Sequence, residues 1–577
     1  MARGFDLSVR LHYNGHPDLQ RMFVRDLATV SRVEVLKGHY SILYGQGAPG
    51  ATINYVGKRP TGSGTITASA SLGNYSLQRY ELDVDSGALA EGVHGRLVAL
   101  DQRSDTWQPH VSNDRRATLA ALSWAPAAGT SVRLEAEWMR NHRPFSFGTV
   151  YVDGRVFFDH SYVAPAATSD RRYGRGGLYV EHRVASDWSL HASYSAGHVN
   201  RDETLAGFFT IASPATLSSY YRQLVDRYRQ EDAGIELRGS VTTGALAHRV
   251  SLGWRQDEYR FDFQGPQNIG GYGIDIDSPD LESLDFGALP LSPRTSSEFN
   301  REHGVHFQDR IAIGQQWHVV AGVRQARLRI DAGTIGARRT VADRSHIATA
   351  LGAVYEPQPS LALHVSYSES YEPNRGADRF GTFIEPRESR QWEAGARLAD
   401  GHDLHVAASA FDITQSNLTM PDPLDRTALV AVGSVRSRGL ELAMQATPMR
   451  PLVAAAALTW QRVRNVVKTS AVLGDELAGV PTRFGHWGLR WAAAEGTEAW
   501  ANVVFVGRRP GDLQNSFGVP GYKRLDLGAA MKLGALELSA QVANALDRRY
   551  VEAITAADNV YQGDRRRLGV TARYRIP

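Results

Sequence analysis

Hydrophobic and polar residues alternate with a period of two along most of this chain. In residues 130–139, the even positions from Val132 to Trp138 are apolar, and the odd positions from Arg133 to Glu137 are charged. Comparable alternation recurs in residues 188–194, 361–367, 404–410 and 536–542. Because successive side chains of a strand point to opposite faces, the pattern predicts β-strands with one apolar and one polar face.

These predicted strands are longer than those of a soluble β-sandwich, which have about 5–6 residues. Short turn signals, such as residues 126–129 and 400–402, alternate with longer loops. The longer loops are expected at residues 141–171, 200–230, 262–297, 371–388 and 545–564. Ten short turns and eleven loops would join 22 strands. This pattern predicts an all-β protein: a 22-stranded antiparallel transmembrane β-barrel spanning residues 61–577, located in the bacterial outer membrane.

A barrel of this size encloses a lumen that requires a plug. Residues 1–60 differ from the rest of the chain, with short apolar segments separated by glycine turns over residues 32–38, 41–50 and 53–60. We therefore predict a partial plug domain over residues 1–60.

The composition excludes further classes of protein and of functional site. The longest apolar run, residues 452–458, is far shorter than the roughly 18 residues of a transmembrane helix. The absence of cysteine removes disulfides, thiolate metal sites and cysteine nucleophiles. A net charge of +3, from 64 basic and 61 acidic residues, gives no indication of nucleic-acid binding.

Several motifs, in order along the chain, resemble those of TonB-dependent outer-membrane receptors, particularly the ferric-siderophore group. In the plug they are Arg3-Gly4-Phe5, Tyr13-Asn14-Gly15, residues 32–38 and Leu43-Tyr44-Gly45; in the barrel they are residues 391–395, 438–442 and 544–550. The resemblance implies an importer and not an enzyme. Its partners would be a ferric siderophore, TonB with its inner-membrane energising complex, and outer-membrane lipid and lipopolysaccharide.

The resemblance also implies that iron is carried by the siderophore, without a covalently bound cofactor or protein metal ligands, and that the receptor is a monomer. The alternatives within transport are cobalamin, haem or a glycan as cargo. A passive channel or surface-binding barrel is the alternative from another class. The family has a signal peptide, a TonB box and an earlier plug half before the Arg-Gly-Phe strand, so we expect this chain, in which Arg3 is almost the first residue, to be N-terminally truncated. It also ends in Pro577, where the family usually has an aromatic residue.

Two groups of residues are candidates for contact with cargo. By matching position, the plug apex would present Arg10, His16, Gln20, Arg21 and Phe23 as exposed side chains. If Leu252 and Trp254 face lipid, parity turns Tyr259, Phe261 and Phe263 toward the lumen at the barrel mouth. Aromatic rings there would pack against an organic chelate. The alternative is an interfacial aromatic girdle or loop packing.

A third group would hold the plug in the barrel. In the family, basic residues of the plug face carboxylates of two barrel motifs, which correspond here to Arg3 and Lys37 facing Glu393 and Glu441. The alternative is four unrelated charges in the lumen.

Other motifs have simpler explanations. Gly45, Gly47 and Gly50 match a dinucleotide-binding pattern, but Pro49 interrupts it and no acidic residue follows at the required distance. The pairs His402/His405 and His303/His306 have a spacing that places the partners on opposite faces of a strand, so we expect polar residues and not metal ligands.

Overall fold

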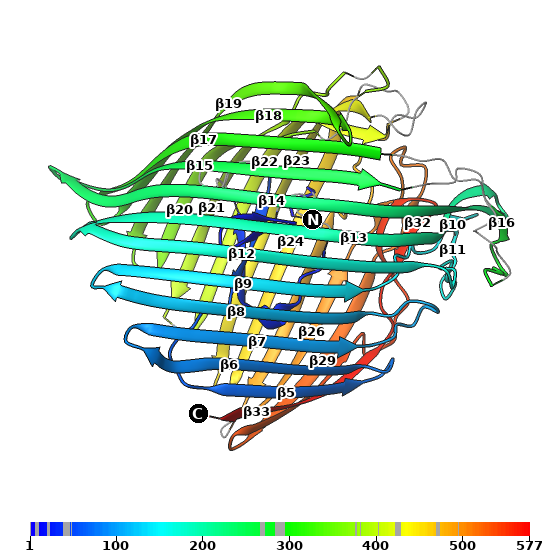
Figure 1. Ribbon diagram of the computed structural model, residues 1–577, viewed down its shortest axis with the longest axis horizontal. Helices are drawn as coiled ribbons and strands as arrows, with labels where there is room; N and C mark the ends of the chain where they lie inside the picture. The colour runs from blue at the N-terminus through cyan, green and yellow to red at the C-terminus, as the bar shows by residue number, and fades with distance from the viewer. Residues whose placement is uncertain are drawn as a thin grey trace.

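The computed structural model shows a closed antiparallel β-barrel with a small sheet in its lumen (Figure 1). It describes residues 2–5, 11–19, 23–37, 47, 49–265, 272–282, 295–374, 378–380, 382–401, 403–421, 429–468, 473–493 and 496–576. Within these residues, no helix is long and apolar enough to cross a membrane.

Twenty-two of the described strands form the barrel wall, as the alternation predicts. They are β5 (Ile66–Gly73), β6 (Gln78–Ala90), β7 (Val93–Arg103), β8 (Asp114–Ala127), β9 (Thr130–His142), β12 (Thr168–Ala185), β13 (Trp188–Ser213), β14 (Thr216–Thr243), β15 (Leu246–Gln264), β17 (Thr295–Ile313), β18 (Trp317–Thr334), β19 (Ala337–Gln358), β20 (Leu361–Glu372), β21 (Arg387–Asp400), β22 (Leu404–Pro421), β23 (Leu429–Met449), β24 (Leu452–Lys468), β25 (Arg483–Ala492), β26 (Thr497–Val506), β29 (Tyr522–Leu533), β30 (Leu536–Ala543) and β33 (Arg567–Ile576). β33 pairs with β5 and closes the barrel.

The two faces of each strand differ in exposure, as the period of two requires. On β15, Leu252 and Trp254 point outward and are 56% and 39% exposed. Tyr259 and Phe263 have the opposite parity and are buried. An apolar exterior with tryptophan side chains is the lipid-facing surface of an outer-membrane barrel.

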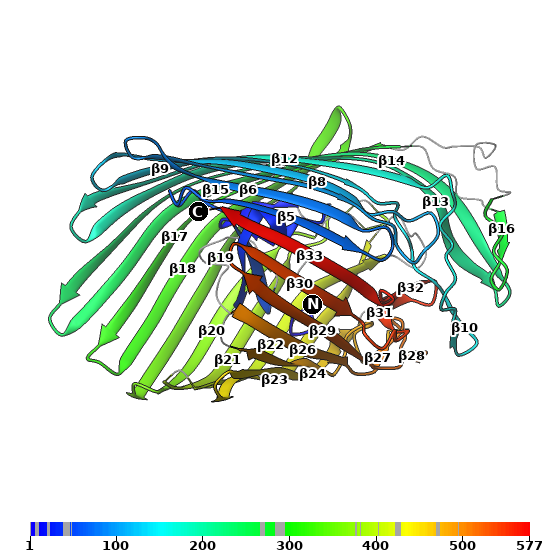
Figure 2. The ribbon, with the colours of Figure 1, turned by 90° about the horizontal axis from the view of Figure 1, so that it is seen from below.

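The plug sheet lies inside the barrel, where the blue N-terminal segment appears in both views (Figures 1 and 2). Its strands are β1 (Leu11–Tyr13), β2 (His16–Asp18), β3 (Val30–Lys37) and β4 (Ala51–Gly57), in the order β2-β1-β4-β3. β1 and β4 are parallel, and the other two pairs are antiparallel. The short 3-10 helix η2 (Leu27–Thr29) begins after Asp26, whose carboxylate accepts a hydrogen bond from the Ala28 amide.

The prediction of a long loop over residues 200–230 is wrong, because β13 and β14 continue pairing until Ser213 meets Thr216. Beyond the wall this hairpin gains its own apolar core, in which Leu217 packs with Tyr162 and Ile274. Shorter strands lie at the same end of the barrel as the tip of this hairpin (Figure 2). They are β10 (Tyr151–Val152), β11 (Arg155–Val156), β16 (Tyr272–Asp275), β27 (Arg509–Pro510), β28 (Gly518–Val519), β31 (Val551–Ala556) and β32 (Asn559–Gln562).

The outward face allows a direct test of the membrane orientation of the wall. Leu252→Arg should destabilise the barrel in lipid by about 2–4 kcal/mol, because it places a charge on the lipid-facing surface. Leu252→Ala, the matched control, keeps the surface apolar and should have a much smaller effect. Denaturant unfolding in lipid vesicles measures both, and equal stability of the two variants would contradict the assigned orientation.

Candidate functional site

Arg3 anchors the first residues of the plug to the barrel wall. Its side chain is 1% exposed, and its guanidinium donates to Glu393 of β21 at 2.6 Å and to Glu441 of β23 at 2.9 Å. It also lies 4.7 Å from the centre of the Phe411 ring. Burial opposes the charge of Arg3, but the hydrogen bonds to Glu441 and Glu393 outweigh it and raise the pKa of the guanidinium.

Residues around Arg3 also contribute to this contact between the plug and the wall. Lys37 extends from β3, and its Nζ lies 2.9 Å from the Glu441 carboxylate. Gly4 has a φ of +88°, and a Cβ at this position would lie 2.5 Å from a methyl group of Val463. Phe5 packs with Val463 in a buried apolar cluster. The structure thus brings together Arg3, Lys37, Glu393 and Glu441.

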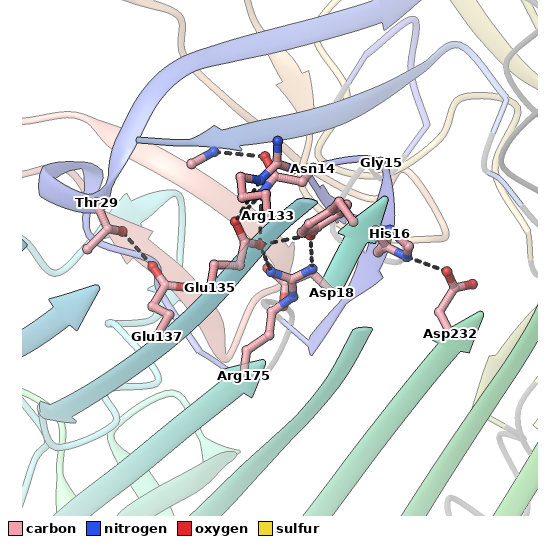
Figure 3. Close-up of polar contacts among 12 residues, drawn as sticks. Asn14, Gly15, His16, Asp18, Thr29, Arg133, Glu135, Glu137, Arg175 and Asp232 are labelled. Atoms are coloured by element: carbon pink, nitrogen blue, oxygen red, sulfur yellow. Dashed lines mark hydrogen bonds and ion pairs between the residues drawn. The ribbon is translucent and has the colours of Figure 1, made fainter. Parts of the chain in front are cut away.

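A second network, which sequence reasoning missed, holds the plug on the opposite flank of its sheet. Arg25 forms an ion pair with Glu137 of β9 and donates to Asp18 at 2.7 Å and to Tyr173 at 2.7 Å. The Thr29 hydroxyl donates to Glu137 at 2.6 Å (Figure 3). Burial raises the pKa of Asp18, but the charges of Arg25 and Arg175 and hydrogen bonds from Arg25 and Tyr173 outweigh it and leave the pKa below its usual value.

The turn between β1 and β2 extends this network. Asn14 and Gly15 have φ values of +50° and +82°, as in a two-residue hairpin turn of type I′. The Asn14 amide donates to both oxygens of Glu135 at 2.9 Å, and Arg175 donates to Glu135 at 2.6 Å (Figure 3). One signal for this network was available, because Glu135 and Glu137 share the polar face of their strand.

His16 and Phe23 do not occupy the exposed positions predicted for them. His16 is 4% exposed, begins β2 and contacts Asp232 of β14, to which Arg255 also donates at 2.6 Å and 2.7 Å. Phe23 is 3% exposed and stacks on Tyr173, with ring centres 5.6 Å apart. The exposure predicted for these two side chains is wrong, because this part of the plug packs against the wall. Arg10, Gln20 and Arg21 lie outside the described residues.

The three aromatic residues predicted at the mouth project into the lumen side of β15. Tyr259 is 6% exposed and shares a buried cluster with Phe23 of the plug. Phe261 is half-buried and stacks on Tyr228, with ring centres 4.8 Å apart. Phe263 is buried in a second cluster, and the Arg222 guanidinium lies 5.2 Å from its ring centre. These rings form one continuous aromatic strip beside the plug.

A hollow of about 330 Å³ is lined by the β1–β2 turn and the neighbouring wall strands. Arg59, Arg133, Tyr179 and His306 contribute to its lining. Within the described residues, no group of three or more histidine, aspartate or glutamate side chains is placed to hold a metal ion.

The contacts of Arg3 predict that removing either carboxylate partner loosens the plug. Glu393→Ala or Glu441→Ala leaves Arg3 buried with one carboxylate fewer, and breaking a buried pair costs about 3–5 kcal/mol. We expect higher ion conductance in planar bilayers, with heat stability of the barrel nearly unchanged. Combining Glu393→Ala with Arg3→Ala should give a non-additive effect, since the two side chains touch.

Glu537→Ala is the matched control, because Glu537 pairs with Arg573 of the wall at 3.1 Å. Its conductance should match that of the unmodified protein. If both Glu393→Ala and Glu441→Ala also conduct like the unmodified protein, these carboxylates do not secure the plug.

His16 makes plug seating dependent on pH. Burial, together with the charges of Arg255 and Arg175, lowers the pKa of the imidazole from its usual 6.5, although Asp232 opposes the shift. The imidazole of His16 binds a proton more tightly when the plug is released than when it is seated. The free energy that holds the plug in place should therefore fall as pH falls from 7.5 to 5, by at most about 1.4 kcal/mol per pH unit.

Hydrogen exchange of residues 11–18, corrected for intrinsic rates, measures this effect. His16→Gln keeps a polar side chain that does not titrate and should show a flatter pH dependence. The same dependence in both proteins would exclude His16 as its source.

Comparisons with known proteins agree with this architecture. The family model "TonB dependent receptor-like, beta-barrel" matches residues 122–545, and "TonB-dependent Receptor Plug Domain" matches residues 1–52. A metal-pseudopaline receptor of Pseudomonas aeruginosa is 28% identical over 91% of this chain and 77% of its own length. The ferrioxamine receptor of Yersinia enterocolitica is 24% identical over 94% of this chain and 79% of its own length.

Solved structures share the fold. The siderophore receptor PiuA from Acinetobacter baumannii has a TM-score of 0.90 at 18% identity, covering 100% of this chain and 90% of its own. The ferripyoverdine receptor of Pseudomonas aeruginosa has a TM-score of 0.86 at 20% identity, covering 100% of this chain and 81% of its own. The barrel model spans more than half of the chain and lies within the wall, and the plug model covers most of the lumen sheet. The chain belongs to the TonB-dependent receptor family of the bacterial outer membrane, which consists of transport receptors and not enzymes.

Proposed function

We propose that this protein imports a ferric siderophore across the outer membrane. The observation that carries the proposal is a lumen sheet held in a closed 22-stranded wall by buried ion pairs. A barrel of this size needs an obstruction that keeps solutes from passing through its lumen. Import of a cargo therefore requires that obstruction to move. The Yersinia relative is named for ferrioxamine, and an Escherichia coli relative, 23% identical over 96% of this chain, for ferrichrome.

The cargo site in this proposal lies between the plug apex and the aromatic strip of β15. Phe261 is the half-buried ring of that strip, so it is the side chain best placed to gain contact with an organic chelate. Arg10, Gln20 and Arg21 remain candidates for cationic and polar contacts with the oxygen atoms of the chelate. Iron would enter and leave with the chelate, without a cofactor bound covalently to the protein.

The proposed partners follow from the same mechanism. TonB and its inner-membrane complex would supply the force that moves the plug, for which we assign residues 1–60, within a monomeric barrel of residues 61–577. Outer-membrane lipid would surround the apolar exterior.

A second candidate is a chelate of another metal. The metal-pseudopaline receptor has the higher identity of the relatives compared, at 28%, which favours this alternative over haem, cobalamin or a glycan. Titrating one siderophore loaded with iron or with another transition metal separates the two: binding of the iron form alone supports the first proposal, and equal binding of both forms supports the second.

Removing the aromatic strip should weaken cargo binding. Combining Tyr259→Ala with Phe261→Ala is expected to cost roughly 1–3 kcal/mol in the binding free energy of a ferric siderophore, as for buried aromatic anchors. Tryptophan-quenching titration measures the affinity. Phe307→Ala, on the outward face of β17, is the control and should bind normally.

Because Tyr259 also packs with the plug, Phe261→Ala is measured alone as well. Unchanged affinity in the single and the double variant would remove these rings from the cargo site, whereas normal affinity with lost uptake would place their role in plug movement.

A further inference from the structure

We propose that the lumen side of the barrel seam carries a second cargo site, which binds the carboxylate and hydroxyl oxygens of a ferric hydroxycarboxylate chelate. The seam is the place where the last wall strand, β33, pairs with the first, β5, and β6 follows on the other side of β5 (Figure 1). This role rests on the proposed import function, for which it names a class of cargo. The seam and the aromatic strip of β15 lie on different strands of the wall.

A hollow of about 340 Å³ lies beside the seam. Leu72 of β5 and Val570 of β33 are exposed on the outside of the barrel. Ser71 and Thr571, one position away, therefore face the lumen, where both line the hollow. Arg567, the first residue of β33 after the last long loop, lines it as well, so the hollow lies toward the end of the barrel with the long loops. Its volume is at the lower end of the range for ligand pockets, about 300–1,000 Å³, and suits a small chelate.

The lining of the hollow is rich in groups that bind oxygen atoms. Its neutral hydrogen-bonding side chains include Ser71, Thr571, Gln102, Asn113 and Gln541. Four arginines and two carboxylates accompany them, and these are Arg79, Arg115, Arg567, Arg573, Glu81 and Asp105. Among the described residues of the lining, Tyr75 is the only aromatic one. This chemistry fits a hydrophilic ligand with several hydroxyl or anionic oxygens and not an aromatic one.

Arg115 has donor capacity left for such a ligand. Arg79, in contrast, donates to both oxygens of Asp26 at 2.8 Å and to Glu81 at 2.5 Å. The Nε atom of Arg115 donates to Asn113 at 3.1 Å, whereas its Nη1 atom approaches Asp26 only to 3.6 Å. Within the described residues, Asp26 is the single ion-pair partner of Arg115. The free edge of this guanidinium matches a carboxylate in a two-point contact.

Asp26 also places the site at the boundary between the plug and the wall. It precedes η2 of the plug and is 5% exposed, while Arg79 and Arg115 belong to the wall strands β6 and β8. A ligand carboxylate on Arg115 therefore binds directly beside a contact that holds the plug. A cargo that passes the plug at this flank meets these groups.

Calorimetric titration of the full chain in non-ionic detergent tests the site, with ferric citrate as the hydroxycarboxylate probe. Ferric citrate should bind the unmodified protein, and Arg115→Gln should weaken it roughly 10-fold, as for lost hydrogen bonds to a charged group. Arg116→Gln is the matched control, because Arg116 is the next residue of β8, has the outward parity and pairs with Asp101 at 2.7 Å. It should leave the affinity unchanged.

Ser71→Ala combined with Thr571→Val is a second variant, which leaves the plug contacts intact. The two hydroxyls lie 2.8 Å apart and bond to each other, so replacing both with apolar groups should hardly affect folding. This variant should weaken ferric citrate roughly 3-fold. Heat-modifiable gel migration verifies that each variant is folded, and the second variant decides alone if Arg115→Gln does not fold.

Ferric hydroxamates and catecholates, titrated in parallel, separate this site from the proposed function. Binding of one of them without binding of ferric citrate would overturn the seam site and leave import of a ferric siderophore standing. Binding of no ferric chelate of any class would overturn both. Unmodified affinity for ferric citrate in the folded variants would show that it binds elsewhere, and would also overturn the seam site.

Discussion

The closed wall is the constraint on which the rest of the structure depends. In a bilayer every backbone hydrogen-bonding group needs a partner within the protein, so a sheet can span it only when its first and last strands pair. Here β33 pairs with β5 along the whole of β5. Closure with 22 strands creates a lumen too wide for wall side chains to fill. The lumen sheet is therefore a consequence of the wall and has to be held against a polar surface.

Polar anchoring suits an obstruction that has to move. Arg3 and Arg25 each meet carboxylates of two different chain segments, so the contact is specific in position. Breaking such a pair costs several kcal/mol while the groups remain dry, but water solvates them once the plug leaves. A large apolar seat would instead remain exposed to water after release. The apolar contacts that accompany the ion pairs are local, Phe5 with Val463 beside Arg3 and Phe23 with Tyr173 beside Arg25.

Much of the fold could be predicted from the sequence because the wall has a simple period. Parity alone placed Trp254 outside and Tyr259 inside. The extended β13–β14 hairpin was not predictable in this way, since beyond the bilayer neither face is required to be apolar. Glu137 was visible as a lumen charge, but its partner Arg25 depends on how deep the plug lies. The burial of His16 depends on the same depth, which no local pattern encodes.

Arginine serves two different purposes in this barrel, and the side of the wall decides which. Arg3, in the lumen, is buried between carboxylates that balance its charge. Arg327, on the exterior, forms two parallel hydrogen bonds with Asp343 of the neighbouring strand. The planar guanidinium matches the geometry of both carboxylate and phosphate in two-point contacts, so its partner is set by which anion the surroundings supply. In the lumen and on this part of the exterior, that anion is a carboxylate that the wall itself supplies.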